Sequence, residues 1–234
     1  MRNISKRTII TSSIGILLII FIVVNSVMLA LDMKEYLDAQ SEYSDITDNV
    51  TIEATKKPTI VQEEDNFPST QYNVPDFSVN HEELEGINPA YIGWLYIPSL
   101  EISYPMVSSA DNIDYLKKTF QGKSNAAGCL FSDCRNDNPL HQRTIVYGHN
   151  MKDGTMFANL FKLEEVDLSS EVEVWVYVPD GTIQRYIVTT VQRAWSTDES
   201  IYYIDPDPST LVLSTCVEGD ERLVVICTKT ATYI

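Results

Sequence analysis

Positive charge is scarce in this 234-residue sequence, which has 17 Lys and Arg residues against 33 Asp and Glu residues and a formal net charge of −16. Proteins that bind nucleic acid need a basic face for the phosphates, so the composition argues against nucleic acid as a partner. Histidine and cysteine are scarce as well, with three and four residues. The cysteines are too sparsely spaced for a metal site without further His or Cys partners. We therefore expect no metal and no other cofactor.

Long hydrophobic runs are also few, and the exception lies near the N-terminus. Residues Thr8–Leu31 carry no charge and are long enough for a membrane-spanning helix, which needs about 20 residues. Three basic residues precede the run: Arg2, Lys6 and Arg7. Because basic flanks stay on the cytoplasmic side, we expect a single-pass protein of the cell membrane with residues 1–7 in the cytoplasm. A cleaved signal peptide is the alternative, and both interpretations export residues 32–234.

Two changes in sequence pattern follow this apolar run. Residues 32–45 can continue as a polar helix, whereas Ser44–Asn80 shows neither the period of a helix nor that of a strand. We therefore interpret residues 32–80 as an extracytoplasmic stalk. From His81 on, the pattern becomes that of a folded domain, which we place at residues 81–234 and expect to be extracellular.

Strand patterns dominate this domain. Eight segments have them: Ile92–Ile97, Ile102–Val107, Gly128–Ser132, Thr144–Tyr147, Val172–Val178, Ile183–Ala194, Leu211–Thr215 and Leu223–Thr228. Helical patterns are short, with an acidic one at His81 and others at Asn112–Thr119 and Thr155–Glu165. Eight short strands with few helices predict a mostly-β fold, a closed eight-stranded β-barrel. We expect three tryptophans to pack this barrel: Trp94, Trp175 and Trp195.

Cys216 ends one predicted strand, and Arg222 opens the next. Facing residues of an antiparallel hairpin have a constant sum of residue numbers, so a three-residue loop would place Cys216 and Arg222 opposite each other on one face of the sheet. A two-residue loop would send Arg222 to the other face. A thiolate is the nucleophile in cysteine chemistry, and a neighbouring cation favours it. The mouth of this hairpin is therefore a candidate catalytic site.

Acyl chemistry at a thiolate also needs a proton carrier, and histidine is the usual one. His149 directly follows a predicted strand in the segment TIVYGHNM, so it shares the strand-end position of Cys216. His81 precedes the strands, and His141 lies in a polar loop. Judged on residues alone, a Cys and a His far apart in sequence are a weak signal, and a packed histidine with an inert cysteine is the alternative.

At these positions the chain resembles a known family. The sequence LSTC at residues 213–216, followed by Arg222 and a β run, is similar to the signature strand of sortases. The resemblance continues through INPAYIGWLYIPSLEISYPMVSS, DNIDYLKKTF, GCLFSDCRND and TIVYGHNMKDGTMFANL, and covers nearly all of residues 85–234. The stretch from Gly128 to Asn136 and the segment YGHNMKDGTMF point to class B sortases. The fold that this implies is a sortase-like β-barrel.

Sortases are cysteine transpeptidases, and the resemblance implies a role for each candidate residue. Cys216 would attack the Thr carbonyl of a C-terminal sorting motif in an exported protein, forming a thioester that an amine then resolves. His149 would act as acid and base, and Arg222 would hold the substrate and stabilise the oxyanion. Three further residues would line the substrate groove: Asn112, Leu116 and Ser214.

The resemblance also implies partners, and here alternatives stay open. The acceptor amine would belong to a peptidoglycan precursor cross-bridge, so that exported proteins become attached to a Gram-positive cell wall. A pilin polymerase would use the same chemistry with a lysine of another protein subunit. A catalytically silent β-barrel that serves as a surface-binding module is the third possibility.

One segment departs from the class B pattern. Class B sortases usually carry a long helical insertion before the cysteine strand. Here Ser196–Thr210 has room for one or two turns around Ile201–Ile204. Since this loop normally shapes the choice of motif, the sequence leaves the sorting motif open.

The other three cysteines are interpreted without a catalytic role. If GCLFSDC were one strand, Cys129 and Cys134 would lie on opposite faces, so a bridge between them would require a turn. Cys227, in the segment LVVICTK, is expected in the core.

Overall fold

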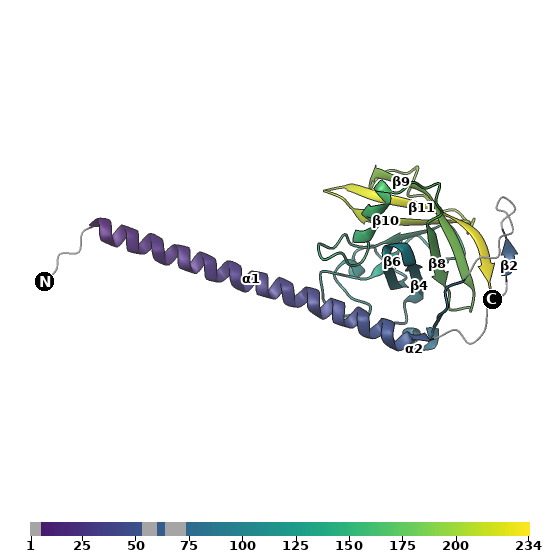
Figure 1. Ribbon diagram of the computed structural model, residues 1–234, viewed down its shortest axis with the longest axis horizontal. Helices are drawn as coiled ribbons and strands as arrows, with labels where there is room; N and C mark the ends of the chain where they lie inside the picture. Colours follow the sequence, from purple (N-terminus) through teal and green to yellow (C-terminus); the bar gives the residue numbers. More distant parts are fainter. Residues whose placement is uncertain (1–5, 53–59, 64–73) are drawn as a thin grey trace. The chain divides into compact units, whose positions relative to one another are not determined.

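The computed structural model describes residues 6–52, 60–63 and 74–234, and the chain divides into two compact units, Met1–Asp38 and Ala39–Ile234. Helix α1, Lys6–Val50, begins in the first unit and ends in the second (Figure 1). From Ile14 on, the large apolar side chains of the first unit are exposed, and the helix is long and apolar enough to cross a membrane. The apolar helix expected near the N-terminus is therefore present.

The second unit is built on a closed barrel. Its strands are β4 (Tyr91–Ile97), β5 (Ile102–Val107), β6 (Leu130–Ser132), β7 (Thr144–Tyr147), β8 (Glu173–Tyr177), β9 (Ile183–Trp195), β10 (Thr210–Cys216) and β11 (Glu221–Tyr233). They are hydrogen-bonded in the order β10-β7-β6-β5-β4-β8-β9-β11, and a further pairing of β10 with β11 closes the circle. The predicted mostly-β fold with a closed eight-stranded barrel is confirmed.

Short elements complete the unit. Strand β2 (Ile60–Glu63) pairs with β11, and β1 (Thr51–Ile52) pairs with β3 (Ser78–Val79). The predicted acidic helix is α2, His81–Ile87. The 3₁₀ helices are η1 (Pro98–Leu100), η2 (Asp114–Leu116) and η3 (Ala158–Glu165). The last two lie inside the predicted helical segments.

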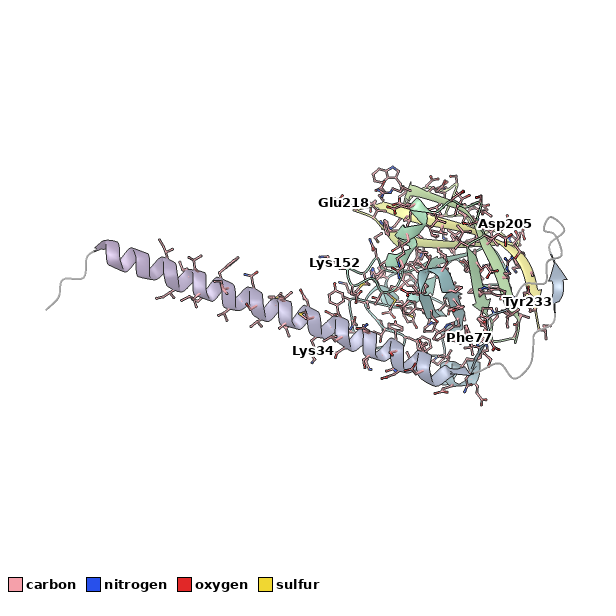
Figure 2. All side chains as sticks on the ribbon, viewed as in Figure 1. Lys34, Phe77, Lys152, Asp205, Glu218 and Tyr233 are labelled. Carbon is pink, nitrogen blue, oxygen red and sulfur yellow. The ribbon has the colours of Figure 1, made fainter. Side chains whose placement is uncertain are left out.

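Two strand pairs in the barrel are parallel, β5 with β6 and β7 with β10. Parallel neighbours end at the same edge of a sheet, so the loops that follow β7 and β10 emerge side by side. Figure 2 shows Glu218 in the turn after β10, at the opposite end of β11 from Tyr233. This edge of the barrel carries the candidate residues.

The tryptophans divide between the interior and the rim. Trp94 and Trp175 are fully buried, and Trp94 Nε1 donates to Ser103 Oγ at 3.0 Å. Trp195 is 65% exposed, so the expectation that it packs the barrel is wrong. It ends β9 opposite Glu221, at the mouth of the sheet and past the packed interior.

Residues 39–50 of α1 belong to the same unit as the barrel. Ala39, Tyr43 and Ile46 are buried, and their spacing of i, i+4 and i+7 is that of one helix face. The folded unit thus begins at Ala39, whereas the sequence led us to expect it at His81. Polar residues flank this short apolar face, which is why the period did not stand out.

Candidate active site

The hairpin between β10 and β11 holds Cys216 and Arg222 opposite each other. They are direct register partners in the antiparallel ladder. Beyond them, Val217 N donates to Glu221 O at 3.0 Å, and Gly219 turns the chain with a left-handed φ of 54°. This is the three-residue loop of Glu218, Gly219 and Asp220, so of the two loop lengths that the sequence left open, the structure has the one that puts Cys216 and Arg222 on one face.

The parallel pair β7 and β10 brings His149 and Cys216 to the same edge of the sheet. Tyr147 is the register partner of Ser214, and His149 and Cys216 each lie two residues further along their chains. The contact between the two chain segments continues one residue past β7, where Gly148 N donates to Ser214 O at 3.2 Å. A hydrogen bond from Asn150 Nδ2 to Cys216 O, at 3.2 Å, ties the two strand ends together.

The imidazole of His149 is held by a backbone carbonyl. Its Nε2 lies 2.7 Å from Leu116 O. A carbonyl oxygen can accept a hydrogen bond but cannot donate one, so Nε2 carries the hydrogen of this bond. In the neutral ring, Nδ1 is then the nitrogen that accepts protons.

Gly148 provides room for this arrangement. A Cβ at this position would lie 2.4 Å from Leu130 Cδ2 and 2.7 Å from Phe157 Cδ2. The backbone before His149 can therefore pack against two apolar side chains as long as residue 148 has no side chain.

An open cavity of about 290 Å³ joins all of the predicted site residues. Its wall consists of Asn112, Leu116, Phe131, Tyr147, Gly148, His149, Ser196, Tyr202, Ser214, Thr215, Cys216 and Arg222. The three residues expected to be catalytic and the three expected to line the substrate groove are thus brought to one place.

The three predicted groove residues are engaged in different ways. Asn112 adopts a left-handed φ of 58°, and its Oδ1 accepts from Cys134 N at 2.7 Å. Leu116 contributes the carbonyl that binds His149. Ser214 is 1% exposed, and its Oγ is hydrogen-bonded to Tyr202 Oη at 2.9 Å.

Arg222 is anchored by the turn beside it. Its Nη1 donates to Gly219 O at 2.7 Å and to Glu221 O at 3.0 Å. A guanidinium has five N–H groups, so these two bonds leave the donors on Nε and Nη2 for a ligand in the cavity.

Sequence reasoning missed several residues of the wall. Tyr147 and Tyr202 line the cavity, and neither was singled out from the sequence. Burial raises the pKa of Tyr202, so its hydroxyl remains a hydrogen-bond donor. The position of Tyr147, two residues before His149 at a strand end, is a signal that could have identified it.

Thr215 is another residue of the cavity wall that sequence reasoning missed. It is 1% exposed and lines the cavity, and within the described part of the chain its Oγ1 has no hydrogen-bond partner. A buried hydroxyl without a partner is costly.

Asp133 supports the wall from behind. Its carboxylate accepts from Tyr147 Oη at 2.7 Å and from Arg135 Nε and Nη2, both at 2.8 Å. Burial alone would raise the pKa of Asp133, but the hydrogen bonds from Arg135 and Tyr147 outweigh it and lower this pKa to about 2. The ionised carboxylate therefore holds the Tyr147 ring in place.

The remaining cysteines lie apart from this chemistry. Each of the four cysteines, all of them within the described residues, is free. Cys129 and Cys227 are buried, whereas Cys134 is exposed. Among residues 6–52, 60–63 and 74–234, no group of three or more His, Cys, Asp or Glu side chains is arranged to hold a metal ion.

Comparison with known proteins agrees with this geometry. The family model of the sortase domain matches residues 95–230. Sortase B of Listeria monocytogenes is 36% identical over 126 residues, which are 53% of this chain and 50% of that protein. The match therefore spans about half the length of this curated relative.

Solved structures show the same fold. Sortase B of Bacillus anthracis has a TM-score of 0.61 at 23% identity, with 85% of this chain and 99% of that chain covered. A Streptococcus pyogenes class B sortase involved in pilus biogenesis has a TM-score of 0.57 at 19% identity, with coverage of 67% and 98%. Since the family model matches residues 95–230, which are more than half of the sequence, the chain belongs to the sortase family, and the relatives that it is similar to are class B sortases.

Proposed function

We propose that this chain is a membrane-anchored cysteine transpeptidase that attaches exported proteins to the peptidoglycan cell wall. The observation that supports it most is the meeting of Cys216, His149 and Arg222 at the wall of one cavity, from two adjacent parallel strands and a hairpin. This arrangement supplies a nucleophile, a proton carrier and a cation at one point. These are the three parts that acyl transfer through a thioester requires.

In the first half-reaction, the Cys216 thiolate attacks the carbonyl carbon of Thr in the sorting motif. The oxygen of the tetrahedral intermediate carries the negative charge, which the remaining N–H donors of Arg222 stabilise. The C–N bond then breaks, and the leaving amine takes a proton from the His149 imidazolium. The products are a thioester on Cys216 and a free C-terminal fragment.

In the second half-reaction, an acceptor amine approaches the thioester. Neutral His149 removes its proton at Nδ1, because Nε2 is already bonded to the Leu116 carbonyl. The amine attacks, the C–S bond breaks, and the thiolate of Cys216 is regenerated. The new amide joins the sorted protein to the acceptor, which we propose is a peptidoglycan cross-bridge.

The experiment that tests this function uses the full-length chain in detergent with peptides that carry candidate sorting motifs. Unmodified protein should cleave one of them after Thr and form an acyl-enzyme detectable by mass spectrometry. Cys216→Ala should form no adduct, and His149→Ala should not turn over. Cleavage by Cys216→Ala would contradict the mechanism.

A pilin polymerase is the second candidate, suggested by the similarity to the Streptococcus pyogenes sortase that is involved in pilus biogenesis. The two functions differ in the acceptor. A cross-bridge peptide amine and a pilin lysine, offered together after acylation, would show which of them resolves the thioester. A catalytically silent binding module would yield neither product, and Cys216 would not react selectively with a thiol probe.

A further inference from the structure

The end of helix α1 is hydrogen-bonded to the loop that follows Leu116, a residue of the cavity wall. Tyr43 is 6% exposed, and its hydroxyl donates to Gly128 O at 2.5 Å while it accepts from Phe120 N at 3.2 Å. These two partners lie near the two ends of the segment 117–128. One hydroxyl therefore closes the loop that connects η2 to β6.

The neighbouring residue of α1 secures the same loop. Glu42 is 5% exposed; its Oε1 accepts from Gln121 N at 3.0 Å, and its Oε2 pairs with Lys123 Nζ at 3.2 Å. Two consecutive helix residues thus bind the loop through its backbone and through one side chain.

Gly128 connects this loop to His149. It has a left-handed φ of 62°, and a Cβ on it would lie 2.5 Å from Tyr115 O, 3.1 Å from Leu116 O and 3.2 Å from His149 Cδ2. The next residue, Cys129, donates its N–H to Tyr115 O at 3.0 Å. The backbone at 128–129 therefore lies directly against the carbonyl that receives His149 Nε2.

A second path also leads from Tyr43 to His149. The Tyr43 ring packs edge-on against Tyr104, with the ring centroids 5.4 Å apart. Tyr104 Oη accepts from Met156 N at 3.2 Å, and Phe157 N donates to His149 O at 2.9 Å. One path thus ends at the imidazole of His149 and the other at its backbone.

We propose that Tyr43 is a positioning residue that holds the Leu116 carbonyl, and through it the His149 ring, in the orientation with Nε2 protonated and Nδ1 basic. Residues 39–50 are on this account part of the catalytic scaffold and not a spacer. This inference rests on the proposed function as far as turnover is concerned. The ring orientation itself can be measured without turnover.

The test compares Tyr43→Phe with Tyr177→Phe in the full-length chain. The first substitution keeps the ring packing at this position and removes the hydrogen bonds of the hydroxyl to Gly128 O and Phe120 N. Tyr177 is the matched control, because it is buried in β8 and its hydroxyl has no hydrogen-bond partner among the described residues. Melting temperatures of both variants establish that they are folded.

The first measurement is the ¹⁵N NMR spectrum of the His149 side chain, assigned by its loss in His149→Ala. Unmodified protein and Tyr177→Phe should show a protonated Nε2 in the neutral ring. Tyr43→Phe should show a mixture of both tautomers. A protonated Nδ1 in the unmodified protein would overturn the inference without any variant.

The second measurement is turnover of a sorting peptide. Tyr43→Phe should lower kcat by roughly 10–100-fold, since a small displacement of a catalytic group has effects on this scale. KM should change little, because Tyr43 does not line the cavity. Unchanged kcat and unchanged tautomer in Tyr43→Phe would refute the role of Tyr43. An unmodified protein that processes no peptide would count against the proposed function, and the NMR comparison would still decide on Tyr43.

Discussion

The guanidinium of Arg222 is held by the turn and still has N–H donors for a ligand in the cavity. Two carbonyls of the turn hold Nη1, and the planar fork leaves Nε and Nη2 parallel and free to act as a pair. A lysine at this position keeps the charge and loses the fork.

We expect Arg222→Lys to lower the acylation rate by ~10²–10³, the scale of a lost oxyanion donor. The fold should persist, because the side chain lies at the rim of the barrel. Rapid-quench mass spectrometry of the acyl-enzyme measures the rate, and circular dichroism serves as the control for folding. Near-full activity in this variant would remove Arg222 from the mechanism.

The residues of the site differ in how far sequence predicts them. Cys216, His149 and Arg222 stand out because their types are scarce and each lies at a strand end. Tyr147 and Tyr202 do not stand out, since a tyrosine in or near a strand has the same pattern whether it faces the core or a cavity. Tyr43 is the extreme case. Its contacts lie 77 and 85 residues away in the sequence.

Gly148 gives a stability prediction. Gly148→Ala places a methyl group against Leu130 and Phe157, so we expect it to lower the free energy of unfolding by about 1–3 kcal/mol. Gly86→Ala is the control, because nothing lies within 4 Å of its Cβ. Urea denaturation of both variants measures the difference. Equal stability of the two would contradict the close approach seen at Gly148.

The four cysteines should differ in their reactivity toward a thiol reagent. Burial raises the pKa of Cys129 to about 12 and raises that of Cys227 as well, so neither forms a thiolate at neutral pH. We expect a thiol reagent to label Cys134 and Cys216 in the native protein and all four cysteines in denaturant. Labelling of Cys129 before unfolding, or its absence after unfolding without reductant, would contradict the free, buried thiol.

Replacing both Cys129 and Cys134 by serine should leave activity largely intact.

At the scale of elements, the segment between β9 and β10 is a short loop held by hydrogen bonds. Tyr202 N and Ile201 N both donate to Asp198 O, at 3.0 and 3.1 Å, which closes a turn at residues 198–202. Helical turns were expected around Ile201–Ile204, so the turn begins three residues earlier than expected. Arg143 is 5% exposed, and it donates from Nη2 to Ile201 O at 2.9 Å and from Nε to Tyr203 O at 3.2 Å. The loop thereby presents Tyr202 to Ser214.

Removing the hydrogen bonds of Arg143 to this loop should affect both stability and substrate binding. Arg143→Met leaves two carbonyls without their charged donor, and we expect a loss of roughly 2–4 kcal/mol in the free energy of unfolding. KM for a sorting peptide should rise, because Tyr202 is no longer held against the cavity. Arg193→Met is the control, since the ion pairs of Arg193 are exposed and contribute little. An unchanged KM in a folded Arg143→Met would separate the loop from motif recognition.

The limits of sequence reasoning are also visible in the elements. Alternation of residues located all eight barrel strands, but it could not choose between a two-residue and a three-residue loop after Cys216. The ends of β9 and β11 extend past the predicted segments because edge positions at Trp195 and Tyr233 continue the ladder. The register between two strands is decided by the hydrogen bonds that join them. The residue pattern of a single strand does not predict these bonds.

For the whole molecule, the main prediction concerns topology. The basic residues before the apolar run favour a cytoplasmic N-terminus, so we expect protease added to intact protoplasts to remove residues 81–234. An epitope tag placed before Arg2 should survive in intact protoplasts and disappear after lysis. Protection of the barrel in intact protoplasts would reverse the orientation.

Closure of the barrel by β10 and β11 sets the moment at which activity can begin. These are the last two barrel strands in chain order, and β10 carries the nucleophile between β7 and β11. A chain in which residues 210–233 have not yet folded lacks both the thiol of Cys216 in place and the β10–β11 pairing that completes the ring. On the proposed function, we therefore expect acylation only after the final hairpin has formed and closed the sheet.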